Sequence, residues 1–177
     1  MSVDLSKQDN KSIIHEGAII SPNCNIETNV KIEDGVVIKP GVFIGSGSTI
    51  KKNTLIHSNV SIYSNSVIGE NCILHSGAVI GSDGLGFAKN GNKWEKIIHY
   101  GYVEIGNSVE VGAGCTIDKA SSGKTVINDG VKLDNQIHLA HNCNLGENTI
   151  VGANTSIAGS VKTVSYTHLT LPTKVTV

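Results

Sequence analysis

An aliphatic residue recurs at every sixth position through most of this 177-residue chain. The first block holds twelve such positions without a slip: Ile14, Ile20, Ile26, Ile32, Ile38, Ile44, Ile50, Ile56, Ile62, Ile68, Leu74 and Ile80. A period of six does not match the 3.6-residue repeat of an α-helix, but it matches a short strand followed by a tight turn. The pattern therefore predicts short strands stacked in a coil.

Two further positions of each hexad support this interpretation. The fourth residue after the aliphatic one is small or β-branched, as at Ala18, Val30 and Thr54. Asn or Gly often precedes that residue, as at Asn23 and Gly35, and both tolerate the left-handed backbone of tight turns. Three hexads would close one triangular coil of eighteen residues, with the aliphatic side chains inside and each strand paired with the next coil.

The hexads resume after an insertion. The second block holds Ile105, Val111, Ile117, Ile127, Leu133, Leu139, Leu145, Val151 and Ile157. The two blocks predict an all-β fold, a parallel β-helix of about seven coils, with an inserted loop at 82–101 and a shorter one at 118–124. We expect residues 1–12 to be a polar lead-in, 13–162 the β-helix domain, and 163–177 a tail outside the repeat that reads as non-native sequence.

The phase of the repeat places both insertions at one corner of the coil. The hexads that begin at Ile80 and Ile117 directly precede the insertions and are three hexads apart, so they lie on the same face. His141 and Gly159 are eighteen residues apart and each follows a hexad of that same face. Because loops on a rigid scaffold commonly carry function, we expect a site at this corner.

The chemistry of these residues suits direct acyl transfer to an amine or a hydroxyl. A histidine with a pKa near 6.5 can take up a proton at neutral pH, and a backbone N–H near Gly159 could stabilise an oxyanion. Covalent catalysis is disfavoured because Cys143, close to His141 in the sequence, occupies an inward position. The residues alone leave open that His141 is an ordinary solvent-exposed turn residue.

The remaining cysteines and histidines have structural interpretations. All four cysteines fall at the small inner position, which favours core thiols in a reducing cytoplasm: Cys24, Cys72, Cys115 and Cys143. His57 and His75 are eighteen residues apart and should stack on one edge. A zinc site there is an alternative, but no third histidine falls in register, so we expect no metal.

Charge and hydropathy exclude other classes of protein. The formal net charge is −1, so the chain lacks the basic stripe of a nucleic-acid binder. No apolar stretch approaches the length of a membrane span, and the polar start has no signal-peptide core. We therefore expect a cytoplasmic protein. Few aromatic residues and 20 glycines disfavour a conventional sandwich or helical core.

Several segments resemble the UDP-3-O-acylglucosamine N-acyltransferases of lipid A synthesis, among the hexapeptide-repeat acyltransferases. The matching segments are Gly81–Ala88, Trp94–Ile97, Thr116–Lys119, Lys132–Asn135, Leu139–Asn142 and Ile157–Ser160. The resemblance implies a left-handed coil, although parallel crossovers are generally right-handed. It also implies a homotrimer with active sites between subunits, and an apparently truncated member, because the family's uridine-binding domain and later coils are missing.

The resemblance further implies roles for individual residues. His141 would be the general base that takes a proton from the glucosamine 2-amino group, and the Gly159 amide would hold the oxyanion. Phe87 and Trp94 would line the groove. Substrate-binding roles would also fall to Asn135, His138 and Asn142. The donor would be a 3-hydroxyacyl chain on the phosphopantetheine of acyl carrier protein, with no other cofactor.

Two alternatives remain from the sequence. One is a related sugar acyltransferase that uses acetyl-CoA or another acyl-CoA, which the missing uridine domain motivates. The other is a non-catalytic or metal-binding β-helix fragment.

Overall fold

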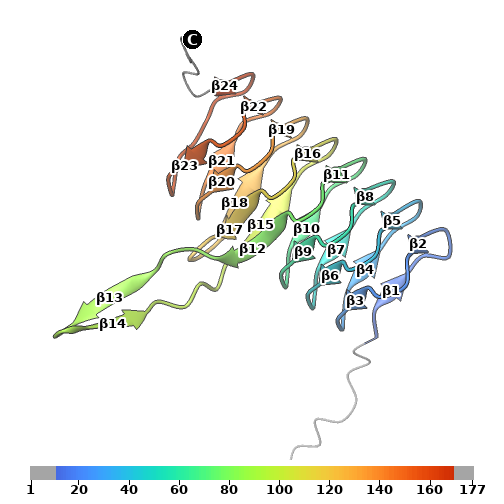
Figure 1. Ribbon diagram of the computed structural model, residues 1–177, viewed down its shortest axis with the longest axis horizontal. Helices are drawn as coiled ribbons and strands as arrows, with labels where there is room; N and C mark the ends of the chain where they lie inside the picture. Colours follow the sequence, from blue (N-terminus) through green and yellow to red (C-terminus); the bar gives the residue numbers. More distant parts are fainter. Residues whose placement is uncertain (1–10, 170–177) are drawn as a thin grey trace, which may run out of the picture.

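The computed structural model describes residues 11–169, which form a three-sided coil of parallel strands with one protruding hairpin (Figure 1). Face A consists of β1 (Ile13–Ile14), β4 (Lys31–Ile32), β7 (Thr49–Ile50), β10 (Val67–Ile68), β15 (Tyr102–Ile105), β18 (Lys124–Ile127) and β21 (Asn144–Leu145). Face B consists of β2 (Ile19–Ile20), β5 (Val37–Ile38), β8 (Leu55–Ile56), β11 (Ile73–Leu74), β16 (Glu110–Val111), β19 (Lys132–Leu133), β22 (Ile150–Val151) and β24 (His168–Leu169). Face C consists of β3 (Asn25–Ile26), β6 (Phe43–Ile44), β9 (Ser61–Ile62), β12 (Val79–Asp83), β17 (Thr116–Lys119), β20 (His138–Leu139) and β23 (Ser156–Ile157).

The hexad positions set the register of the coil. Ile14 pairs with Ile32, eighteen residues on, and Ile80 pairs with Ile117 across the large insertion. The aliphatic hexad residues from Ile32 to Leu145 fill the interior and are at most 3% exposed. Seven strands on two faces and eight on the third confirm the predicted stack of about seven coils.

The tight turns use the residue types that the sequence indicated. Asparagines occupy most of the non-glycine positions with positive φ, including Asn23 (63°), Asn59 (62°) and Asn142 (61°). An asparagine tolerates this left-handed conformation better than other side-chain-bearing residues because its short amide can hydrogen-bond locally. The turns therefore allow three two-residue strands to close within eighteen residues.

The large insertion is a β-hairpin that projects from the corner between faces C and A (Figure 1). Its strands are β13 (Phe87–Asn90) and β14 (Lys93–Lys96), paired antiparallel. Gly91 supplies the positive φ (59°) that a tight hairpin turn needs. The inserted loop is thus confirmed. The coil continues past it, because β10 pairs with β15 and β12 pairs with β17, with a register shift between Ile80 and Ser82 where the insertion begins.

The coil extends beyond its expected end. We expected the chain to leave the repeat after Val161, but β24 pairs in parallel with β22, and Lys162 bridges to Asn144. Leu169 keeps the six-residue phase, two hexads after Ile157, and packs against the core. Residues 163–169 of the expected tail therefore continue the coil, whereas residues 1–10 of the lead-in and 170–177 of the tail lie outside the described residues.

Over residues 11–169 the structure has no helix with the length and apolar character needed to cross a membrane.

Candidate active site

The predicted corner brings His141 and Gly159 into contact. His141 follows β20 and Gly159 follows β23, in neighbouring coils of the same face. A Cβ atom at position 159 would lie 2.9 Å from Nε2 of His141 and 3.0 Å from its Cε1, which is closer than real Cβ atoms approach. A side chain at position 159 would therefore displace the His141 ring, whereas glycine lets the backbone lie against the imidazole edge.

Hydrogen bonds around Asn142 define the tautomer of His141. Oδ1 of Asn142 accepts hydrogen bonds from the Ser121 backbone N–H (3.0 Å) and hydroxyl (3.1 Å), and its Nδ2 donates to the Ser122 carbonyl (2.9 Å). The same Oδ1 lies 3.0 Å from Nδ1 of His141. Since an amide oxygen only accepts, Nδ1 carries a proton, and in the neutral imidazole the lone pair then lies on Nε2, the ring nitrogen beside Gly159.

Both insertions meet at this corner, as the phase of the hexads predicted. Residues 121 and 122 of the shorter insertion hold Asn142 through the bonds just described. Gly84 of the larger insertion also lies against His141, because a Cβ there would be 3.3 Å from the ring Cδ2. The backbone of Asn142 is also anchored, since its N–H donates to the Thr125 hydroxyl (2.9 Å).

A second polar group lies beside the corner on face C. Nδ1 of His138 is 2.8 Å from the Thr116 hydroxyl, and its Nε2 is 3.8 Å from the buried carboxylate of Asp118. The Ser82 hydroxyl donates to the other oxygen of Asp118 (3.0 Å). A Cβ at Gly84 would contact both Asp118 and His141, so this carboxylate lies next to the candidate base. The sequence reasoning had not selected Asp118.

Ion pairs fasten the base of the hairpin to the coil. The Asp83 carboxylate contacts Nζ of Lys96 on β14 (2.7 Å) and Nζ of Lys119 on β17 (2.8 Å). Hydrogen bonds from Lys119 and Lys96 lower the pKa of Asp83 to about 2. The hairpin is thus held at its base by a carboxylate between two ammonium groups.

Phe87 and Trp94 lie on the hairpin itself. With Leu85 they line an open cavity of about 440 Å³. Their side chains are 45%, 70% and 87% exposed in the order Phe87, Trp94, Leu85, so this apolar surface is uncovered in the single chain. The structure therefore brings these two predicted residues together on the hairpin.

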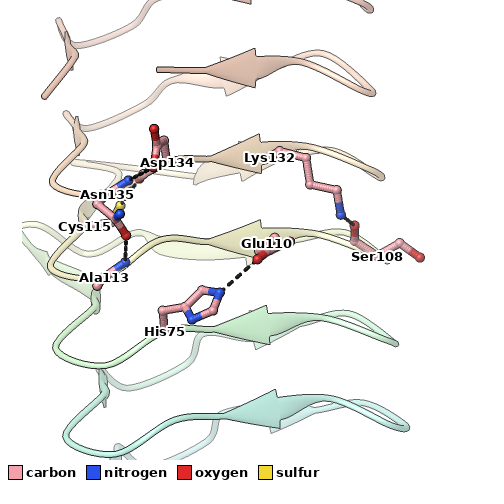
Figure 2. A network of polar contacts seen from close by, with 8 residues as sticks. All are labelled: His75, Ser108, Glu110, Ala113, Cys115, Lys132, Asp134 and Asn135. Atoms are coloured by element: carbon pink, nitrogen blue, oxygen red, sulfur yellow. Dashed lines mark hydrogen bonds and ion pairs between the residues drawn. The ribbon is translucent and has the colours of Figure 1, made fainter. Parts of the chain in front are cut away.

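Asn135 lies away from the other predicted site residues. It occupies the corner between faces B and C, where its Oδ1 accepts a hydrogen bond from the Ala113 N–H (2.8 Å), as Figure 2 shows. Within one chain Asn135 therefore supports a turn and does not join the group around His141. The surface beside it on face B is a shallow groove of about 600 Å³.

The two stacked histidines lie at the corner where Asn135 lies, as their spacing predicted. The rings of His57 and His75 are parallel within 6° and 5.1 Å apart. His75 forms a 2.9 Å contact with Glu110 (Figure 2). Within residues 11–169, no three His, Cys, Asp or Glu side chains are grouped in a way that could hold a metal ion.

The structure adds a histidine that the sequence reasoning had not selected. His99, at the end of the large insertion, is 4% exposed, and its ring stacks on that of His141 with centroids 5.7 Å apart. It lies in a segment without hexads, so no register could place it. The one sequence signal was its position directly before the chain re-enters the coil.

The fold and this corner together define the class of protein. It is a parallel β-helix protein in which two loops surround a histidine that lies against the backbone of a glycine. The family model for the bacterial transferase hexapeptide (six repeats) matches residues 11–46, 47–82 and 124–159. The chain belongs to this hexapeptide-repeat transferase family.

Named relatives agree with the resemblance seen in the motifs. The chain is 54% identical over 86 residues to a UDP-3-O-acylglucosamine N-acyltransferase from Dechloromonas aromatica (strain RCB), which covers 49% of this chain and 25% of that protein. It is 51% identical over the same length to the protein of the same name from Herminiimonas arsenicoxydans. The aligned part is thus about a quarter of the length of these relatives.

Solved structures of other proteins have the same coiled fold. A UDP-N-acetylglucosamine acyltransferase from Bacteroides fragilis 9343 superposes with a TM-score of 0.64 at 28% identity, covering 85% of this chain and 55% of that one. The Arabidopsis UDP-N-acetylglucosamine acyltransferase gives a TM-score of 0.58 at 28% identity, with coverage of 88% and 58%. The left-handed parallel β-helix is confirmed by these neighbours and the repeat family.

Proposed function

We propose that this chain carries the acyl-transfer site of a lipid A N-acyltransferase. The reaction would move a 3-hydroxyacyl chain from acyl carrier protein to the 2-amino group of UDP-3-O-acylglucosamine. The observation that carries the proposal is the placement of His141, whose Nδ1 contacts the Asn142 amide oxygen and whose Nε2 lies against the Gly159 backbone at the corner where both insertions meet. The names of the relatives supply the acceptor, and the motif resemblance supplies the donor.

The proposed mechanism is direct attack without an acyl-enzyme. The amine lone pair adds to the thioester carbonyl while Nε2 of His141 takes one amine proton. The resulting oxyanion is held by the Gly159 N–H, which has no acceptor within residues 11–169. Collapse of this intermediate forms the amide and breaks the C–S bond, and the imidazolium returns the proton to the leaving thiolate.

The proposal also assigns roles to the surrounding groups. Asn142 holds the tautomer of His141, while His138 and Asp118 offer polar contacts to the sugar beside it. The apolar cavity on the hairpin suits an acyl chain. In a single chain this corner is open to solvent on one side. The proposal is therefore completed by a homotrimer, in which a neighbouring subunit closes the groove.

The test is a comparison of His141→Ala with His57→Ala. The purified protein is assayed with 3-hydroxyacyl carrier protein and UDP-3-O-acylglucosamine. Loss of a general base lowers kcat by about 10²-fold or more, whereas His57→Ala, at another corner, keeps kcat within about twofold. Full activity of His141→Ala contradicts the base assignment, and turnover with acetyl-CoA alone contradicts the carrier-protein donor.

A second candidate differs in the acceptor. Two solved structures, which cover 85% and 88% of this chain, are named UDP-N-acetylglucosamine acyltransferases, and the same base could activate a sugar hydroxyl. The product separates the two candidates, because hydroxylamine cleaves an ester at neutral pH and leaves an amide intact.

A further inference from the structure

In the large insertion a polar side chain is buried while the apolar side chains around it are exposed. From Leu85 to Tyr100 every residue except Gly86 and His99 is exposed. The neighbours of His99 show the contrast: Ile98 is 58% exposed and Tyr100 is 82% exposed, whereas His99 is 4% exposed. Apolar side chains normally occupy buried positions in preference to histidine. The burial of His99 therefore calls for an explanation other than hydrophobicity.

Hydrogen bonding does not explain this burial. Nδ1 of His99 is buried and has no hydrogen-bond partner within residues 11–169. A buried polar atom without a partner is costly, so other interactions must hold the ring in place. The backbone on its C-terminal side supplies an anchor, because the N–H groups of Tyr100 and Gly101 donate to the carbonyls of Ser121 and Ala120.

The contacts of the His99 ring are with the candidate base and a glycine. Its plane is tilted by 27° from that of His141, with centroids 5.7 Å apart, within the range of offset aromatic stacking. A Cβ at Gly86 would lie 3.0 Å from Nε2 of His99. The two imidazoles are therefore enclosed by backbone that lacks side chains: Gly86 contacts His99, and Gly84 and Gly159 contact His141.

We propose that His99 is a positioning residue, which sets the plane of the His141 ring so that Nε2 stays against Gly159. This inference rests on the proposed function of His141. The hydrogen bond from Nδ1 to Asn142 restrains one edge of the imidazole, and the stack restrains its face. Two such restraints together fix the direction of the Nε2 lone pair, and small misplacements of a reacting group are costly in rate.

The kinetic test separates ring stacking from simple volume. His99→Phe keeps a flat ring and removes the unpaired nitrogen, and His99→Leu keeps bulk without a flat face. We expect His99→Phe to retain kcat within about threefold, and His99→Leu to lower kcat about tenfold with KM within about twofold. His57→Leu is the matched control, because it breaks a histidine stack at a different corner and should leave kcat unchanged.

A measurement without turnover makes the test independent of the proposed reaction. In the folded protein, the nuclear Overhauser effect between His141 Hε1 and the Gly159 Hα protons should be strong, since Cε1 lies against this glycine. It should persist in His99→Phe and His57→Leu and weaken in His99→Leu, whose fold is checked by its circular dichroism spectrum. The tautomer of His141, read from its ¹⁵N shifts, should be the same in all variants because Asn142 sets it.

The outcomes distinguish the two proposals. An unchanged Overhauser effect and an unchanged kcat in His99→Leu overturn the positioning role. Equal losses in His99→Phe and His99→Leu overturn it as well, since stacking would then not be the cause. If His141→Ala keeps full activity while the Overhauser pattern follows the expectation, the positioning role stands and the proposed function fails.

Discussion

Asn142 combines a backbone role and a chemical role in one residue. Its φ of 61° belongs to the turn of the hexad, and its side chain sets the tautomer of His141 and contacts residues 121 and 122. An ordinary turn asparagine has only the first role. The structure therefore distinguishes Asn142 from the other left-handed asparagines by its side-chain contacts alone.

Substitution of Asn142 tests this second role. Asn142→Ala should lower kcat about 10-fold to 100-fold, because Nδ1 of His141 loses its acceptor and the ring samples the wrong tautomer. Asn154→Ala is the matched control, since Asn154 has nearly the same φ (59°) and lies at another corner. Steady-state kinetics and thermal melts of both variants provide the measurement. An equal drop in kcat for both would attribute the effect to the turn.

The core thiols provide another prediction at the scale of residues. Burial raises the pKa of Cys72, Cys115 and Cys143, and the Sγ–H of Cys143 donates to the Ala158 carbonyl (3.0 Å). These three thiols should react with iodoacetamide much more slowly than Cys24 in the folded protein, and all four should react in urea. Peptide mass spectrometry after timed labelling gives the rates. Rapid labelling of Cys143 would contradict the inward position assigned to it.

At the scale of elements, the hairpin depends on Asp83 at its base. The pKa of Asp83 lies near 2, below its ordinary value of 3.8, because Lys119 and Lys96 stabilise the carboxylate. The stabilisation is therefore complete above about pH 4 and is lost as the pH falls through about 2. In that window the hairpin should loosen from β17.

Fluorescence can follow this loosening because the chain has one tryptophan, Trp94, on β14. Its anisotropy should decrease as the pH falls from 4 to 2. In Asp83→Asn the anisotropy at neutral pH should already be low, with no further step in this window. A step of the same size in Asp83→Asn would show that other groups control the hairpin.

The elements also show which features of the structure could be predicted from the sequence. Hexad counting predicted the strands, the shared face of Ile80 and Ile117, and the common corner of His141 and Gly159, because each of these follows from a fixed register. The stacking of His99 on His141 was missed because the insertion has no register to count. The extension to β24 was missed because Thr163 replaces the aliphatic residue, although Leu169 restores the phase.

At the scale of the whole molecule, the large insertion carries several exposed apolar side chains. Leu85, Trp94 and Tyr100 of the large insertion are each at least 70% exposed, and Phe87, Ile97 and Ile98 of the same insertion are at least 45% exposed. Contiguous exposed apolar surface of this kind commonly marks an interface. The proposed homotrimer would cover it with a neighbouring subunit.

Sedimentation equilibrium tests this assembly. The purified protein should give about three times the chain mass of 18.6 kDa, and the double variant Leu85→Ser, Trp94→Ser should shift the distribution toward monomer. Trp94→Phe is a control that keeps an apolar ring and should preserve association. A protein that sediments as a monomer at micromolar concentration would contradict the groove between subunits.

Because His141 and Gly159 lie in successive coils, the distance between their backbones is set by the distance between neighbouring coils. Adjacent parallel strands lie roughly 4.8 Å apart whatever their sequence, so no hinge or side-chain length sets this separation. Whole eighteen-residue units could be gained or lost below β12 while the pair keeps its geometry. A lineage of such proteins can therefore gain or lose whole coils of its body and keep one arrangement of the reacting groups.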